Sequence, residues 1–245
     1  MNKIKTIISK EWAEVFKNRI VLFTVAFLPI LFLALPIITL VAMNSFEAEM
    51  ASSMNTGEME AFVGQLCNGL DEMSCTILYM LNLYTLMFMM VPVIIPVTIA
   101  AYSIVGEKTS RSLEPLLATP ITTSELLLGK MIAACVPAIA ITWVAFIIYA
   151  ISVWFMVSEV VFRLAMAPMW LLAIFVVGPL LSLLAVSTAV LISSRVTDPR
   201  SAEQLSAFVI LPLILLLIGQ SMGLILIDAR MIFFLGVLVL ALDVI

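Results

Sequence analysis

Residues able to do chemistry are few in this chain of 245 residues. The sequence contains no histidine, so the commonest metal ligand and general base in proteins is missing. This argues against a zinc-dependent membrane protease and against a Ser-His-Asp hydrolase. No GxxxxGK(S/T) phosphate-binding motif occurs either, so we expect no ATP site within the chain. The sequence therefore predicts neither a catalytic site nor a resident metal ion.

The well-charged segment between two long apolar runs is 106–130, GEKTSRSLEPLLATPITTSELLLGK. It predicts a short helix over 113–118, with leucines on one face at i, i+3 and i+4. Thr119-Pro120 ends that helix, and Thr122-x-x-Glu125 predicts a capping box that starts the next one. On pattern alone the segment is either a docking element or an ordinary connector at the membrane interface. The residues expected to form its contact surface are Glu107, Arg111, Leu113, Glu114, Leu116, Leu117, Thr119, Pro120 and Glu125.

The elements around this segment belong in a membrane. The chain is 64% hydrophobic and 11% charged, whereas a soluble domain carries about 25% charged residues. The apolar residues also come in long blocks, which predicts an all-α polytopic protein, multi-pass in the cell membrane, with a single transmembrane domain over 1–245. The first block is too long for a signal peptide. Six spans are expected: Ile20–Met43, Leu78–Val105, Met131–Val157, Pro168–Ser193, Leu205–Ile227 and Met231–Ile245.

The sixth apolar run is incomplete as a span. At 1.5 Å per residue it covers about 22 Å, against a hydrocarbon core of about 30 Å. Either the natural chain continues past Ile245 or this run is a re-entrant half-helix.

The N-terminal segment 1–19 is basic and amphipathic. Apolar side chains, Trp12 and Phe16 among them, recur at helical spacing on one face, and lysines fall mostly on the other. This pattern is typical of a helix lying in the membrane interface. The alternative is a frayed, charged tail.

Lysine and arginine counts predict the orientation of the spans. Segment 1–19 carries five, loop 44–77 carries none, and loop 106–130 carries three. We therefore expect a cytoplasmic N-terminus, a cytoplasmic 106–130 loop and an outward-facing 44–77 loop. In that oxidising location Cys67 and Cys75 either form a disulfide or remain two thiols. The acidic residues of the same loop form either a solvated face or a cation site.

The fifth span contains Gly219-x-x-x-Gly223, a spacing that lets helices approach closely. The partner helix would belong to this chain or to a second membrane subunit. Gln220 and Ser221 beside the glycines would hydrogen-bond across that contact or line a substrate path.

Ion-coupled carriers usually place ionisable residues near the centre of a span, and no span of this chain shows an obvious one. The energy source is therefore expected outside this chain.

The 106–130 segment resembles the loop between the second and third spans of type-2 ATP-binding-cassette (ABC) exporter permeases of the sodium- and drug-exporting branch. The similar stretches are Gly106–Lys108, Leu113–Pro120 and Glu125–Lys130. The resemblance implies that this loop carries a coupling helix that docks on a separate ATPase subunit, with 1–19 as an interface helix beside it. The chain departs from the family in its short sixth run. Its 228–230 turn is also too short for the extracellular helical pair seen in some members.

The resemblance implies a membrane-spanning permease subunit of an ATP-driven exporter. It further implies two ATPase copies, which would bind ATP and Mg²⁺, and a second permease copy or paralogue. Membrane lipid is the other expected partner. The chain would not be an enzyme itself, and no basic patch indicates nucleic acid. The alternatives are a non-transporting membrane scaffold or immunity-type protein, and an intramembrane enzyme. Sodium, a drug, a peptide and a lipid all remain possible substrates.

Overall fold

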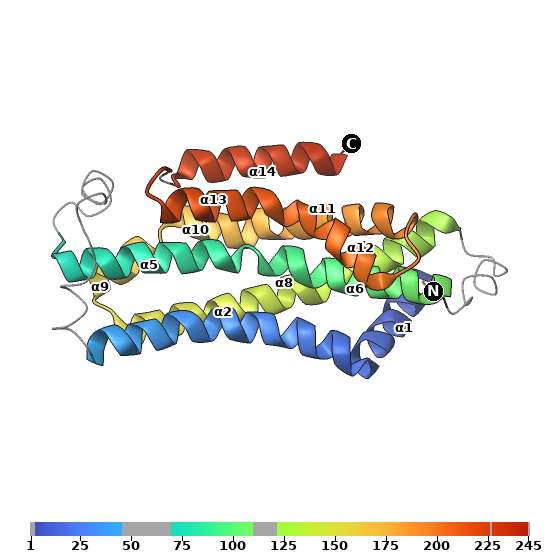
Figure 1. The fold of residues 1–245 in the computed structure, drawn as a ribbon, viewed down its shortest axis with the longest axis horizontal. Helices are drawn as coiled ribbons and strands as arrows, with labels where there is room; N and C mark the ends of the chain where they lie inside the picture. Colours follow the sequence, from blue (N-terminus) through green and yellow to red (C-terminus); the bar gives the residue numbers. More distant parts are fainter. Residues whose placement is uncertain (1–2, 46–69, 110–121, 226, 245) are drawn as a thin grey trace.

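The computed structural model describes residues 3–45, 70–109, 122–225 and 227–244. Every element in these ranges is a helix, which confirms the all-α prediction (Figure 1). The elements are α1 Lys3–Lys17, α2 Arg19–Ser45, α5 Glu72–Phe88, α6 Val91–Thr109, α8 Thr123–Met156, α9 Glu159–Ala165, α10 Pro168–Leu172, η2 Ala173–Val177, α11 Gly178–Ser193, α12 Pro199–Ser206, η3 Ala207–Ile210, α13 Leu211–Ser221 and α14 Ala229–Val244.

Five stretches of the described chain are long and apolar enough to cross a membrane. They are Val21–Met43, Glu72–Lys108, Thr123–Met156, Pro168–Ser193 and Arg200–Ser221. Each overlaps one predicted span, so the expected series of membrane helices is confirmed for the first five. The sixth, α14, has 16 residues and covers about 24 Å. The structure and the long apolar helices define a multi-pass membrane protein.

The second span is longer than predicted and lies at the centre of the bundle (Figure 1). It runs from Glu72 to Lys108, and 78% of the residues in its most apolar stretch are buried. A short turn at Met89 and Met90 divides it into α5 and α6. Pro92 explains this break, because a proline lacks the amide hydrogen and its ring clashes with the carbonyl four residues earlier, here that of Phe88.

The fourth span also departs from a regular α-helix just before a proline. The five residues of η2 adopt a π-helix immediately before α11, whose second residue is Pro179. The amide of Gly178 bonds to the carbonyl of Ala173, five residues earlier. This wider turn removes the clash that Pro179 would otherwise make in a regular helix.

Two of the hydrogen bonds in the interior of the bundle connect different spans. The indole of Trp170, which is fully buried, donates to Asn82 Oδ1 at 2.7 Å. Tyr149, also fully buried, donates to the carbonyl of Leu81 at 3.2 Å. Both contacts join the central second span to other spans, so they fix how these helices meet.

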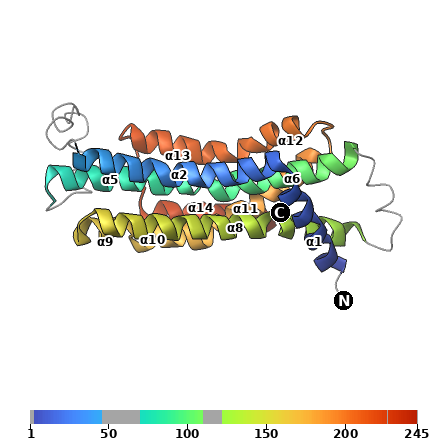
Figure 2. The same ribbon diagram turned by 90° about the horizontal axis from the view of Figure 1, so that it is seen from below.

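The N-terminal helix α1 lies at an angle to the bundle rather than along it (Figure 2). Asn18 marks the bend between α1 and α2, and its side chain accepts a hydrogen bond from the amide of Val21 at 3.5 Å. The helix predicted from the amphipathic pattern is therefore present, while its position in the membrane interface stays a prediction. The end of α6, the start of α8 and α12 lie at this same end of the bundle (Figure 1).

Candidate functional site

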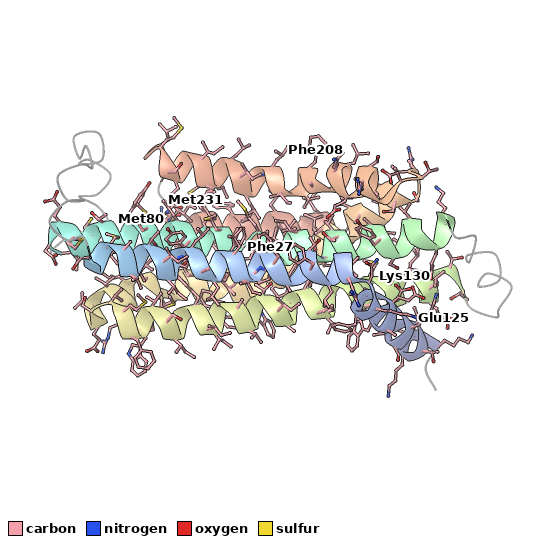
Figure 3. The ribbon with its side chains drawn as sticks, turned by 60° about the horizontal axis from the view of Figure 1, so that its bottom comes forward. Phe27, Met80, Glu125, Lys130, Phe208 and Met231 are labelled. Atoms are coloured by element: carbon pink, nitrogen blue, oxygen red, sulfur yellow. The ribbon has the colours of Figure 1, made fainter. Side chains whose placement is uncertain are left out.

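The two helices that flank segment 110–121 meet α1 at one end of the bundle. The end of α6 precedes this segment, the start of α8 follows it, and α1 packs against both. Figure 3 shows Lys130 and Glu125 on α8 in the region where α1 lies. The charged side chains of these three helices meet here, and we refer to Lys10, Glu11, Ser103, Glu107 and Lys130 as the lysine–glutamate cluster.

Lys130 is the centre of the lysine–glutamate cluster. Only 5% of the residue is exposed. Its Nζ lies 2.7 Å from Glu11 Oε1 on α1 and 2.9 Å from Glu107 Oε2 on α6. The same nitrogen donates to Ser103 Oγ at 2.6 Å. One ammonium group therefore joins all three helices.

Further contacts connect the two carboxylates to Lys10 and Ser103. Lys10 Nζ donates to Glu107 Oε1 at 2.6 Å. The hydroxyl of Ser103 donates to Glu11 Oε2 at 2.5 Å. Glu11 and Glu107 are each about as buried as Lys130. Each carboxylate oxygen of this pair thus faces a donor or a lysine ammonium.

The lysine–glutamate cluster is electrically balanced, because two lysines face two buried glutamates. Balance matters here, since an unpaired buried charge loses its hydration without compensation. Burial alone would lower the pKa of Lys10, but the hydrogen bond and charge of Glu107, with smaller contributions from Glu14 and Glu11, outweigh it and raise the pKa. Lys10 is therefore charged at neutral pH.

Three carboxylates, those of Glu11, Glu14 and Glu107, have oxygens within 4.8 Å of one another. This grouping is one that could hold a metal ion by distance alone. Lys10 and Lys130 already occupy the positions between them, and Lys10 Nζ also lies 3.5 Å from Glu14 Oε1. We therefore interpret the group as an ion-pair network.

Packing contacts hold α1 on α8 beside the charged groups. Gly129 allows the close approach, because a Cβ at that position would lie 2.8 Å from Ile7 Cγ2. The indole of Trp12 donates to the carbonyl of Ala133 at 3.0 Å. That carbonyl has no helical donor of its own, because the residue four positions later is Pro137. Trp12 thus satisfies the backbone group that the proline leaves free.

The predicted start of α8 is confirmed at Thr122. Its hydroxyl accepts from the amide of Glu125 at 3.3 Å, and Glu125 Oε2 accepts from the amide of Thr122 at 2.9 Å, forming the expected capping box. Lys3 Nζ on α1 lies 3.7 Å from the same Glu125 oxygen. The third span therefore starts earlier than Met131 and carries a second contact to α1.

The end of α6 also contacts the chain that follows α11. Lys108 Nζ donates to the carbonyls of Ser194 and Val196, at 3.2 and 3.0 Å, just after α11. A cation at this position stabilises the free carbonyls of a helix C-terminus. The residues next to segment 110–121 are thus connected to the fourth span as well as to α1 and α8.

The predicted contact residues divide into two groups. Glu107 and Glu125 are described, and both take part in the contacts among α1, α6 and α8. The others lie outside the described residues, so their roles stay predictions: Arg111, Leu113, Glu114, Leu116, Leu117, Thr119 and Pro120. The sequence reasoning missed Lys10, Glu11, Ser103 and Lys130. The available signal was Glu11, which lies one turn after Ile7 on the apolar face of α1.

The prediction for the fifth span needs correction. The helix α13 ends at Ser221 rather than at Ile227, and Gly223 follows it with a positive φ of 69°. The two glycines therefore do not share one helical face. Gly219 faces its own chain instead, since a Cβ there would lie 2.8 Å from Ile225 Cδ1. The backbone carbonyls of Gln220 and Ser221 accept from the hydroxyl of Tyr79, at 2.9 and 3.2 Å.

The predicted disulfide stays a prediction. Cys75 is buried near the start of α5, whereas Cys67 and most of loop 44–77 lie outside the described residues. Which end of the bundle faces the cytoplasm also stays a prediction. The structure does place the two segments expected there, the N-terminal helix and the described ends of the 106–130 loop, at one end (Figure 1).

Comparison with known families agrees with this architecture. A family model described as "ABC-2 family transporter protein" matches residues 5–235, nearly the whole chain. No curated protein and no solved structure gave a significant match. The chain belongs to the ABC-2 family of transporters, and it is a membrane transport component of the permease type.

Proposed function

We propose that this chain is the permease subunit of an exporter driven by a separate ATPase subunit, which docks on segment 106–130. The observation that carries the proposal is the lysine–glutamate cluster. It joins the helix before the docking segment, the helix after it and the N-terminal helix through buried ion pairs. A force applied to the segment therefore reaches all three helices together.

The physical basis is the cost of separating these charges. Removing one partner from a buried ion pair destabilises a protein by about 3–5 kcal/mol. Moving α6 away from α8 would separate Glu107 from Lys130 and leave each charge without its partner, at a similar cost in free energy. We therefore expect α1, the end of α6 and the start of α8 to move as one body. That body would transmit ATP-driven closure of the ATPases to the membrane spans.

The proposed complex contains two permeases and two ATPases, and the ATPases bind ATP and Mg²⁺. This chain would contribute the membrane path and no nucleotide site. The exposed apolar faces of α2 and α8, with residues such as Phe23, Phe27 and Ile148, would meet lipid or the second permease. Transport would run outward, as the resemblance of segment 106–130 implies, with a substrate that a screen of sodium, drugs, peptides and lipids would identify.

The experiment is co-purification with the ATPase, followed by a test of coupling. We expect the double variant Leu116→Glu and Leu117→Glu to lose ATP-driven transport, because it places charge on the predicted docking face. Gln204→Glu, exposed on α12 at the same end of the bundle, is the matched control and should transport normally. Normal transport by the double variant would show that docking does not use this face. Absence of any associated ATPase would favour the scaffold or immunity-type alternative.

A further inference from the structure

The last helix, α14, packs into the bundle beside the fourth span. It runs in the same direction as α10 and α11 and contacts both them and η2 (Figure 1). The contact is close at Gly236, where a Cβ would lie 3.2 Å from Val177 Cγ2. Ile232 and Val239 are buried on the same helix. These contacts fix the register of α14 against the membrane span.

Asp243 lies two helical turns after Gly236, or about 10.5 Å further along the axis. On α11, Ser182 lies about 7.5 Å beyond Val177 by the same measure. The two residues are therefore at similar depth in parallel helices. Cys135 on α8 is at this depth too, since its thiol donates to the carbonyl of Ser182 at 3.6 Å.

The carboxylate of Asp243 has no compensating group in the described part of the chain. Both of its oxygens are buried and without a hydrogen-bond partner there. The hydroxyl oxygen of Ser182, a fully buried residue, also has none. Because nearly all buried polar groups in proteins are hydrogen-bonded, the unpartnered carboxylate of Asp243 indicates a group that binds a proton or a small ligand.

Among the described residues, no cation pairs with this carboxylate. The elements that pack most closely against α14, namely α10, η2 and α11, contain no ionisable residue. On α8, Lys130 is held by Glu11 and Glu107, and the thiol of Cys135 has no cationic form. An ionised carboxylate left alone inside a membrane costs several kcal/mol. Adding a proton removes the charge and supplies a hydrogen-bond donor.

We propose that Asp243 is a proton-binding site inside the membrane domain, on the helix α14 where it packs beside α11. With the proton bound, α14 packs neutrally against its neighbours. Loss of the proton leaves a buried charge, which favours movement of α14 away from α11. The site would give the transporter a proton-dependent contact that does not involve the ATPase-docking end.

The test is reaction with dicyclohexylcarbodiimide, which modifies protonated carboxyl groups in apolar surroundings. The full protein, reconstituted in lipid nanodiscs, is treated near neutral pH and the adducts are located by mass spectrometry. Asp198, which is exposed in the loop before α12, is the internal control. An exposed aspartate has a pKa of about 3.9 and is protonated in about one molecule in a thousand at neutral pH, so we expect at least about tenfold more adduct on Asp243 than on Asp198.

The adduct on Asp243 should decrease as the pH is raised, and it should be absent from Asp243→Asn. This variant replaces the acid by a neutral group of the same shape, so it should elute from size-exclusion chromatography as the unsubstituted protein does. Equal or absent labelling at Asp243 would overturn the proposal. Protection by sodium chloride but not by choline chloride would also overturn it, since the site would then bind sodium.

Discussion

Replacing Lys130 by methionine tests the lysine–glutamate cluster most severely. The variant loses three contacts, to Glu11 at 2.7 Å, to Glu107 at 2.9 Å and to Ser103 at 2.6 Å. Lys10 still faces Glu107, so one buried negative charge remains without a partner. Breaking a buried pair in this way costs about 3–5 kcal/mol. For a protein of this size, 1 kcal/mol shifts the melting temperature by about 2–4 °C, which predicts a decrease of roughly 6–20 °C.

The matched control is Arg163→Met. Arg163 also pairs with a glutamate at 2.6 Å, but both side chains are more than 70% exposed. An exposed pair contributes less than about 1 kcal/mol, so we expect a change of at most a few degrees. The melting temperature of each purified variant is measured from the fraction that still elutes as folded protein in size-exclusion chromatography after heating.

A second substitution separates charge balance from packing. Adding Glu11→Gln to Lys130→Met restores neutrality, because Lys10 and Glu107 then remain as a balanced pair. The double variant should therefore recover most of the lost stability. Equal effects of Lys130→Met and Arg163→Met, or strictly additive losses in the double variant, would refute the reasoning.

Three further predictions concern the contacts around this site. Gly129→Ala places a Cβ against Ile7 and should destabilise the protein by about 1–3 kcal/mol; Ile7→Ala in the same chain should relieve the loss, as thermal unfolding would show. Trp170→Phe leaves the Asn82 amide oxygen without its donor and should cost about 1–3 kcal/mol, whereas an unchanged melting temperature would rule out that bond's importance. The pKa of Lys10 is raised in the folded protein, so the stabilising contact of its ammonium group is present below the ordinary pKa of 10.5 and is lost as the pH rises through the pKa of the folded state. The melting temperature of the unsubstituted protein, measured across this alkaline range, should therefore fall more steeply than that of Lys10→Met.

Much of the membrane architecture could be predicted from the sequence. Long apolar blocks are a direct consequence of the thickness of the bilayer, so five spans overlap their predicted ranges. The capping box at Thr122 was predictable because it depends on residues only three positions apart. The divisions of the second and fourth spans follow from Pro92 and Pro179, which the sequence shows, although it does not show which prolines break a helix.

The lysine–glutamate cluster could not be predicted in the same way. Lys130 is 119 residues from Glu11, and no local pattern relates positions so far apart. The sequence placed Lys130 simply among the basic residues of a loop. Its burial becomes evident only when α1 folds back onto α8 at Gly129. Asp243 was overlooked for the same reason, since its isolation depends on the uncharged neighbours that α10, η2 and α11 supply.

In the proposed mechanism, an ATPase subunit docked on segment 106–130 moves the membrane spans of this chain. The most direct measurement is ATP-driven transport by the co-purified complex in liposomes, with ATP hydrolysis recorded in the same sample. For the variant carrying Leu116→Glu and Leu117→Glu, we expect transport to be lost while Gln204→Glu transports at the rate of the unsubstituted complex. Transport and hydrolysis that remain coupled in the double variant would contradict the account.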